Sequence, residues 1–206
     1  MARPPSNDIA HEQVTDHWIK KTVSQERLPL ATSGELEVVG GATASDRDLG
    51  LAYAQMAARG DRQSALRAID LLLNAERQPA APRDHELHAQ LGFLEQLDGK
   101  TQQAAEEYRL ALAADSFDSL AGGNLAFIEA GQHHDAEAIR LWDSVFTHDP
   151  VQLGAGLNLA VVACKTGQRS VATSTLERLL VFSPENEKAR IMLASIRSGK
   201  QSCGVE

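Results

Sequence analysis

Pairs of a leucine and a small residue recur at a fixed interval along the last two thirds of the chain. Leu91-Gly92 is followed by Leu125-Ala126, Leu159-Ala160 and Leu193-Ala194, each pair 34 residues after the one before. Self-similarity at such a period is the signature of a repeat protein. The register also places other apolar residues, three or four positions apart as on one face of a helix. These are Ala104, Tyr108 and Ala111, then Ala138, Trp142 and Val145, then Ala172, Leu176 and Leu179.

This pattern predicts pairs of antiparallel helices. Small residues on both helices of a pair allow close approach, and the large residues fill the gap to the next pair. Each pair alone leaves an apolar face open, which stacking of several pairs buries. We expect an all-α array over residues 46–199, with repeats beginning near residues 46, 85, 119 and 153 and a solitary capping helix from 187. The first repeat carries a five-residue insertion at residues 78–82.

Glycine, proline and capping residues predict where these helices begin and end. Gly60, Gly99 and Gly167 fall at the turns inside three of the repeats, where glycine can adopt the left-handed conformation that ends a helix. Ser183-Pro184-Glu185 is typical of a helix start, with a capping serine, proline at the first helical position and an acid in the first turn. Asp149-Pro150 predicts a similar start for the preceding unit. Nine helices are expected after residue 45.

The pattern resembles the tetratricopeptide repeat (TPR), whose unit also has 34 residues. The resemblance covers about 150 residues and implies a right-handed superhelix of helix pairs. Two features depart from the family pattern. Position 11, commonly tyrosine, is Glu95 in the second unit and Glu129 in the third, and the turn glycine of the third unit falls early, at Gly131.

The resemblance implies a concave groove lined by the first helix of each repeat, which the family uses to hold peptides or proteins. The wall positions of this chain are apolar at its centre, and only Lys165 could contribute to the family's cationic carboxylate clamp. Exposed apolar patches mark binding surfaces. We therefore expect an apolar peptide or amphipathic helix as the partner, bound by Phe93, Leu97, Leu120, Phe127, Leu157 and Val161. An equally weighted alternative is that the chain's own segment around Val14, Trp18 and Ile19 fills the groove.

Residues 1–45 do not follow the repeat and are expected to be irregular, with part of the segment packed on the repeats. Residues 8–20 resemble the stretch that joins the last haem motif to TPRs in some bacterial multihaem c-type cytochromes. That resemblance would make His11 and His17 axial haem ligands, although the chain has no C-x-x-C-H motif. The alternative function is thus the TPR portion of an electron-transfer protein whose haem sites lie outside this chain. Localisation would be cytoplasmic as the sequence is written, or periplasmic for a fragment of an exported cytochrome.

Composition excludes several classes of partner and of structure. The 206 residues carry a net charge of -8, which argues against nucleic acid as a partner. No apolar run reaches the roughly 18 residues of a membrane span. Two cysteines, Cys164 and Cys203, are too few for a disulfide framework. We expect Cys164 to be structural and residues 200–206 to form a disordered tail.

No constellation of residues predicts catalysis. The chain contains no nucleophile elbow, and Gly99-Lys100-Thr101 lacks the first glycine of a phosphate-binding loop. His85 and His88 could share a metal ion, but a third ligand at workable spacing is missing from the local sequence. The expected protein is a non-catalytic scaffold without cofactor or metal.

Overall fold

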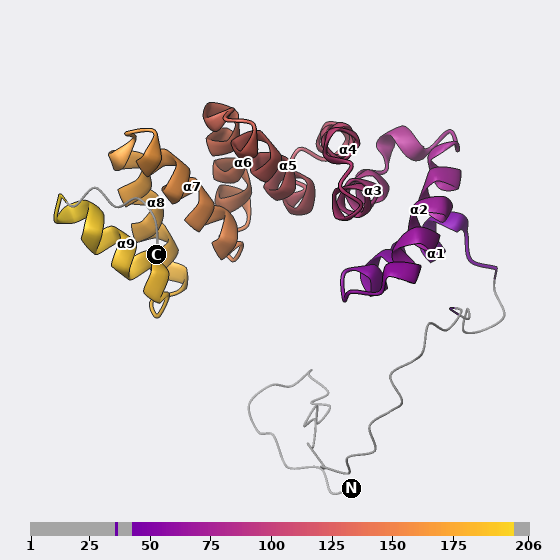
Figure 1. Ribbon diagram of the computed structural model, residues 1–206, viewed down its shortest axis with the longest axis horizontal. Helices are drawn as coiled ribbons and strands as arrows, with labels where there is room; N and C mark the ends of the chain where they lie inside the picture. The colour runs from indigo at the N-terminus through magenta and orange to yellow at the C-terminus, as the bar shows by residue number, and fades with distance from the viewer. Residues whose placement is uncertain (1–35, 37–42, 200–206) are drawn as a thin grey trace, which may run out of the picture. The chain divides into compact units, whose positions relative to one another are not determined.

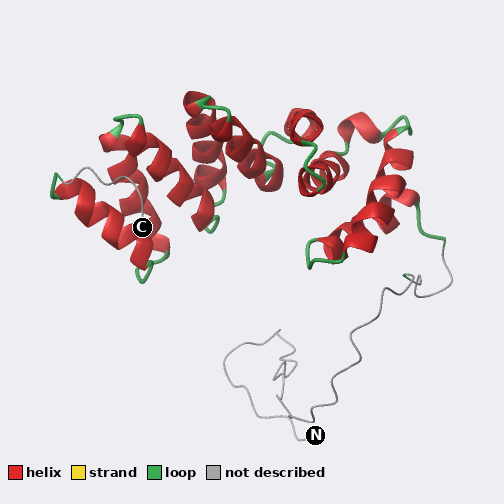
Figure 2. Cartoon of the chain, viewed as in Figure 1, coloured by secondary structure: helices red, strands yellow, loops and turns green. Residues whose placement is uncertain are grey.

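The computed structural model describes residue 36 and residues 43–199, and this part of the chain is built from helices without any strand (Figure 2). The α-helices are α1 (Asp46–Ala57), α2 (Arg62–Glu76), α3 (His85–Leu97), α4 (Thr101–Ala114), α5 (Ser119–Gly131), α6 (Asp135–His148), α7 (Leu153–Lys165), α8 (Arg169–Phe182) and α9 (Glu187–Arg197). A short 3-10 helix, η1 (Ala81–Arg83), lies between α2 and α3.

The helices pack as consecutive pairs, α1 with α2, α3 with α4, α5 with α6 and α7 with α8, and α9 packs on α8 (Figure 1). Each second helix also contacts the first helix of the next pair. The first helices begin at residues 85, 119 and 153, and α9 begins at 187, so the interval of 34 residues in the sequence is also the interval of the structure. The predicted all-α fold of four helical pairs and a capping helix is confirmed.

Close approach inside each pair depends on the small residues of the first helix. A Cβ atom added to Gly92 would lie 2.9 Å from two ring carbons of Tyr108 on α4, and one added to Gly156 would lie 3.1 Å from Leu179 on α8. Tyr108 and Leu179 are fully buried. Gly92 therefore has the physical role expected from the sequence, because a larger side chain would overlap the Tyr108 ring. Gly156 is a further close approach that the repeat pattern did not predict.

Backbone conformation explains how the third repeat turns without a glycine at the usual place. Gly60, Gly99 and Gly167 have positive φ angles of 97°, 79° and 83°. In the third repeat this conformation is adopted by His133, with φ of 62°, while Gly131 is the last residue of α5. His133 is 34 residues after Gly99 and 34 before Gly167, so the turn keeps its place in the repeat and is made by histidine, although a non-glycine residue in the left-handed region is uncommon.

Helices α7 and α9 begin where the repeat register places them, but the roles predicted for Pro150 and Pro184 at their starts are wrong. Pro184 lies in a turn between α8 and α9, and α9 is capped by Asn186, whose side chain accepts a hydrogen bond from the Ala189 amide (3.0 Å). The Ser183 amide instead donates to the Leu179 carbonyl and so closes α8, and the Ser183 carbonyl accepts from Asn186 (3.1 Å). Pro150 likewise lies ahead of α7, which begins at Leu153. Proline at the second position of a tight turn competes with proline at a helix start, and here the turn forms.

Several predictions concern residues outside the described part of the chain. These are the irregular segment before residue 43, the tail 200–206, the haem-ligand candidates His11 and His17, and the segment around Trp18. Leu36 is described: it packs against the apolar cluster of the first repeat, and its amide donates to the Tyr53 hydroxyl (3.0 Å).

Candidate functional site

The six predicted groove residues all lie on first helices: two on α3, two on α5 and two on α7. Phe127 and Leu97 are the most exposed of them, with 61% and 57% of their surface accessible. The other four are partly buried and pack against the core, namely Phe93, Leu120, Leu157 and Val161. Phe93, Phe127 and Val161 are separated by one repeat each, so the repeat presents an apolar side chain at the same position of three successive first helices.

A hollow lies beside Leu120. Residues of α5, α6 and α7 line a hollow of about 290 Å³ that includes Leu120 and the indole of Trp142. The indole nitrogen donates to the Gly123 carbonyl (3.2 Å), which fixes the ring against α5. We call the six residues together with this hollow the first-helix face.

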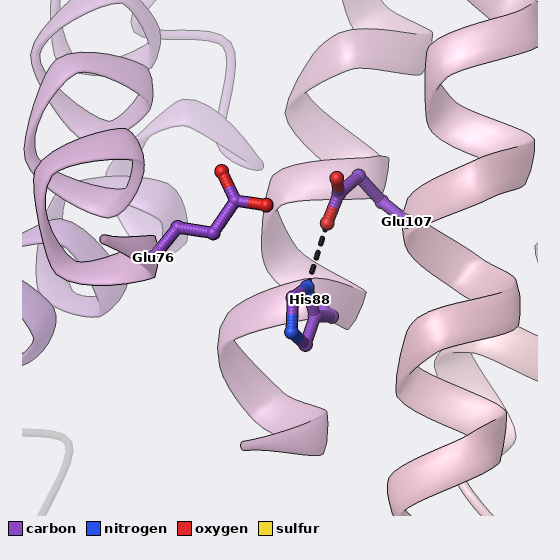
Figure 3. Close-up of side chains that lie close together, drawn as sticks. All are labelled: Glu76, His88 and Glu107. Atoms are coloured by element: carbon purple, nitrogen blue, oxygen red, sulfur yellow. Dashed lines mark hydrogen bonds and ion pairs between the residues drawn. The ribbon is translucent and has the colours of Figure 1, made fainter. Parts of the chain in front are cut away.

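A second feature is polar and was not predicted. Glu76 is the last residue of α2, His88 lies on α3 and Glu107 on α4, and one donor atom from each lies within 4.8 Å of the other two. Figure 3 shows the three side chains pointing toward one another, with a hydrogen bond between His88 and Glu107. That contact joins Nδ1 of His88 to Oε2 of Glu107 over 2.7 Å, and Nε2 of His88 lies 3.0 Å from the Ala81 carbonyl oxygen.

The pKa values of the ionisable groups here are shifted because several of these groups are buried close together. His88 is 2% exposed. Its contact with Glu107 raises the pKa of His88 above its ordinary value, outweighing the effect of burial. Burial and then repulsion from Glu107 raise the pKa of Glu76. The same two causes raise the pKa of Glu95 to about 7, and its Oε2 atom is buried without a hydrogen-bond partner.

A related network occupies the equivalent place one repeat later. Glu129, at the position of Glu95 in its own repeat, accepts a hydrogen bond from Arg109 (2.7 Å) and contacts Nδ1 of His134 (2.7 Å). Its side chain is 7% exposed. Burial acts to raise the pKa of Glu129, but its side-chain hydrogen bonds with His134 and Arg109 outweigh burial and lower it. The two glutamates that depart from the family pattern are thus both buried polar groups, and only Glu129 has a full set of partners.

His85 and His88, which the sequence offered as a metal pair without a third ligand, contact different carboxylates. His85 contacts Asp118 through Nδ1 (2.7 Å), whereas His88 contacts Glu107 and Ala81. The carboxylates near His88 come from the preceding repeat and from the second helix of its own repeat, which spacing along one helix could not show. The one local sign of a polar cluster in the sequence was Glu95, which replaces the tyrosine usual at that place in the repeat. Cys164 is buried in the core, at 5% exposure.

No protein-family model matches the chain, and no curated protein matches it by sequence. Among solved structures, a tetratricopeptide repeat protein from Parabacteroides merdae superposes with a TM-score of 0.62 at 20% identity, covering 75% of this chain and 60% of that one. This chain therefore spans less than two thirds of that protein's length.

MamA is also similar in structure. MamA AMB-1 superposes with a TM-score of 0.61 at 20% identity, over 76% of this chain and 82% of that one. MamA RS-1, as a double mutant, gives 0.61 at 18% identity, over 77% and 87%. At such identities the similarity establishes the fold alone. The described part of the chain is accordingly a TPR-type helical repeat, and none of its helices is long and apolar enough to cross a bilayer.

Proposed function

We propose that the protein is a non-catalytic interaction scaffold that binds an apolar peptide or amphipathic helix on the first-helix face. The observation that carries the proposal is the exposure of Phe127 and Leu97. Large apolar side chains that remain more than half exposed beside partly buried apolar neighbours are typical of a contact surface, because covering them removes apolar area from water.

The spacing of the apolar residues suits a linear partner. Phe93, Phe127 and Val161 occur once per repeat on successive first helices, so a helix or extended segment lying across those helices would meet an anchor from each. Aromatic anchors surrounded by smaller apolar contacts are the usual centres of binding energy. Lys165 is the only cationic residue among the predicted wall positions of α3, α5 and α7. The face therefore favours apolar contacts over the recognition of a carboxylate.

The test is a binding measurement with labelled amphipathic peptides, each compared with a version in which its apolar residues are changed to serine. Phe127→Asp should weaken binding of the apolar version at least about tenfold, since loss of a hot-spot anchor costs about 2 kcal/mol or more. Leu110→Asp is the matched control, because Leu110 is an exposed leucine (44%) on the second helix α4. Equal loss in both variants, or equal binding of the serine version, would refute the proposal.

Occupation of the face by the chain's own N-terminal segment is tested by limited proteolysis with mass spectrometry, comparing the full chain with one that begins at Ser45. If residues 10–40 resist cleavage and their removal lowers stability, the segment covers a face of the repeats. In that case Phe127→Asp should increase cleavage of the segment. Rapid loss of the segment with no change in the repeats would leave the face open to an external partner.

The electron-transfer alternative depends on His11 and His17, which lie outside the described residues. A Soret band in the visible absorption spectrum of native material would support it and would place the repeats in a docking role.

A further inference from the structure

Three helices bring a set of metal-ligating atoms together at the junction of the first and second repeats. Glu76 ends α2, His88 lies in the second turn of α3 and Glu107 lies in the middle of α4. Their donor atoms are all within 4.8 Å of one another, and this is the one such group of three or more among the described residues. A zinc ion lies about 2.0–2.2 Å from nitrogen and oxygen ligands, so two ligands of a tetrahedral ion are separated by about 3.4 Å. Side-chain movements on the order of 1 Å would bring all three donors to that spacing.

The protonation of His88 follows from its neighbours. Nε2 lies 3.0 Å from the Ala81 carbonyl oxygen, which can only accept, so Nε2 carries the proton. In the neutral ring Nδ1 then presents a lone pair toward Oε2 of Glu107, 2.7 Å away. Two lone pairs at that distance repel, so the contact as it stands holds a proton between them. A metal ion could take the place of that proton once the two atoms move apart to about 3.4 Å. A histidine that donates one ring N–H to a backbone carbonyl while its other nitrogen faces carboxylates has the outer-shell arrangement of most metal-bound histidines.

A single proton leaves part of the cluster without a partner. That proton would join His88 to Glu107. The Glu76 carboxylate points toward the same two side chains but forms no hydrogen bond with either (Figure 3). Glu95 is seven residues after His88, on the same face of α3, and its Oε2 is buried without a hydrogen-bond partner. Carboxylates in excess of their proton donors, beside a fully buried imidazole, are better matched by a divalent cation.

We propose that Glu76, His88 and Glu107 form a binding site for a divalent transition-metal ion with the preferences of Zn²⁺. Imidazole nitrogen selects zinc and its first-row neighbours over Mg²⁺ and Ca²⁺, which take oxygen ligands. Three protein ligands leave a fourth position, which a water molecule fills. The insertion after α2 takes part, because Ala81, which orients the His88 ring, begins η1. A bound ion would tie α2, α3 and α4 together and so fix the first repeat against the second.

The decisive variant is Glu76→Gln in the full chain. Glu76 is the ligand with the least structural role, since His88 and Glu107 already hold each other, and its replacement removes a charge that repels Glu107. Zn²⁺ binding is measured by calorimetry, and thermal unfolding is followed with and without the ion. The native chain should bind one Zn²⁺ and unfold at a higher temperature in its presence, since an ion that binds the folded state stabilises it. Glu76→Gln should bind at least about tenfold more weakly and lose the thermal shift.

Glu106→Gln is the matched control, because Glu106 is an exposed carboxylate next to Glu107 on α4. It should bind Zn²⁺ as the native chain does, and Mg²⁺ should shift neither protein. Weak binding by exposed histidines is common to all three proteins and cancels in the comparison. X-ray absorption at the zinc edge should show nitrogen and oxygen ligands at about 2.0–2.2 Å. Equal Zn²⁺ affinity in the native chain and Glu76→Gln, or a sulfur ligand in the absorption spectrum, would overturn the proposal and leave the cluster as a proton-bridged pair.

Discussion

Two adjacent glycines of α5 allow the same substitution to be tested in opposite surroundings. A Cβ added to Gly122 would lie 2.7 Å from Cγ2 of Val145 on α6, whereas one added to Gly123 would meet no atom within 4 Å. Alanine at either position removes the helix penalty of glycine. Gly122→Ala and Gly123→Ala therefore differ only in whether the new methyl group has space, which makes them a direct test of close packing between paired helices.

The expected magnitudes follow from the structure. Replacing glycine by alanine inside a helix gains about 0.8–1.0 kcal/mol, so Gly123→Ala should be stabilised by up to about 1 kcal/mol. Ordinary carbon contacts lie at about 3.5–4.0 Å, so Gly122→Ala starts with an overlap near 1 Å. Val145 is buried and its β-branched side chain has essentially one rotamer in a helix. Overpacking typically costs about 1–3 kcal/mol, which makes Gly122→Ala destabilised by up to about 2 kcal/mol.

The assay is urea unfolding followed by the helical circular dichroism signal, with thermal unfolding as a second measure. For a domain of this size, 1 kcal/mol corresponds to about 2–4 °C in Tm. Gly123→Ala should unfold at a higher temperature than the native chain and Gly122→Ala at a lower one. If both variants shift in the same direction by the same amount, Val145 does not limit the approach of α5 to α6, and the packing argument fails.

Two further predictions concern charged groups of the second and third repeats. The pKa of Glu129 is lowered in the folded chain, so its contacts stabilise the fold above its unfolded pKa near 4.5 and this contribution is lost as pH falls through the lowered value. Glu129→Gln should therefore reduce Tm at neutral pH and flatten the decline of Tm on acidification, and an unchanged decline would contradict this. Asp118 caps α5 by accepting from the Ala121 amide (2.8 Å). Asp118→Ala should cost about 0.5–2 kcal/mol in urea unfolding while Asp118→Asn retains most of the cap, and equal losses would show that the contact with His85 matters more.

The repeat register could be predicted because each of its signals is local. Gly92 faces Tyr108 on the partner helix of its own pair, and Leu91 packs in the apolar cluster of the preceding repeat. Equivalent residues recur 34 positions later, so one period of sequence carries one unit of structure. Phe127 and Leu97 occupy positions expected to line the groove, and both are exposed. The repeat pattern does not identify the partner that would cover them. The register of Gly99 and Gly167 places the third turn at residue 133, but nothing in the sequence shows that His133 adopts the left-handed conformation while Gly131 stays in the helix.

The cluster around His88 could not be predicted for a different reason. Its ligands are separated by 12 residues between Glu76 and His88 and by 19 between His88 and Glu107, and they converge only because α3 packs against both α2 and α4. The insertion could be recognised in the sequence as a break in the repeat. The contact of its Ala81 carbonyl with the His88 ring could not be predicted. The roles predicted for Pro184 and Pro150 were wrong because proline suits a turn and a first helical position equally well, and hydrogen bonds of the preceding helix decide between them.

Helix α3 carries residues of both proposals, and this makes them separable by experiment. Phe93 and Leu97 belong to the first-helix face, whereas His88 is buried against α4. Glu76 lies on α2, outside the first-helix face, so Glu76→Gln removes a metal ligand without altering any peptide contact. If Zn²⁺ strengthens peptide binding by the native chain but not by Glu76→Gln, the ion acts by holding α3 in place. If peptide affinity is the same with and without Zn²⁺, then the face is organised by helix packing alone, and the two sites act independently on one repeat.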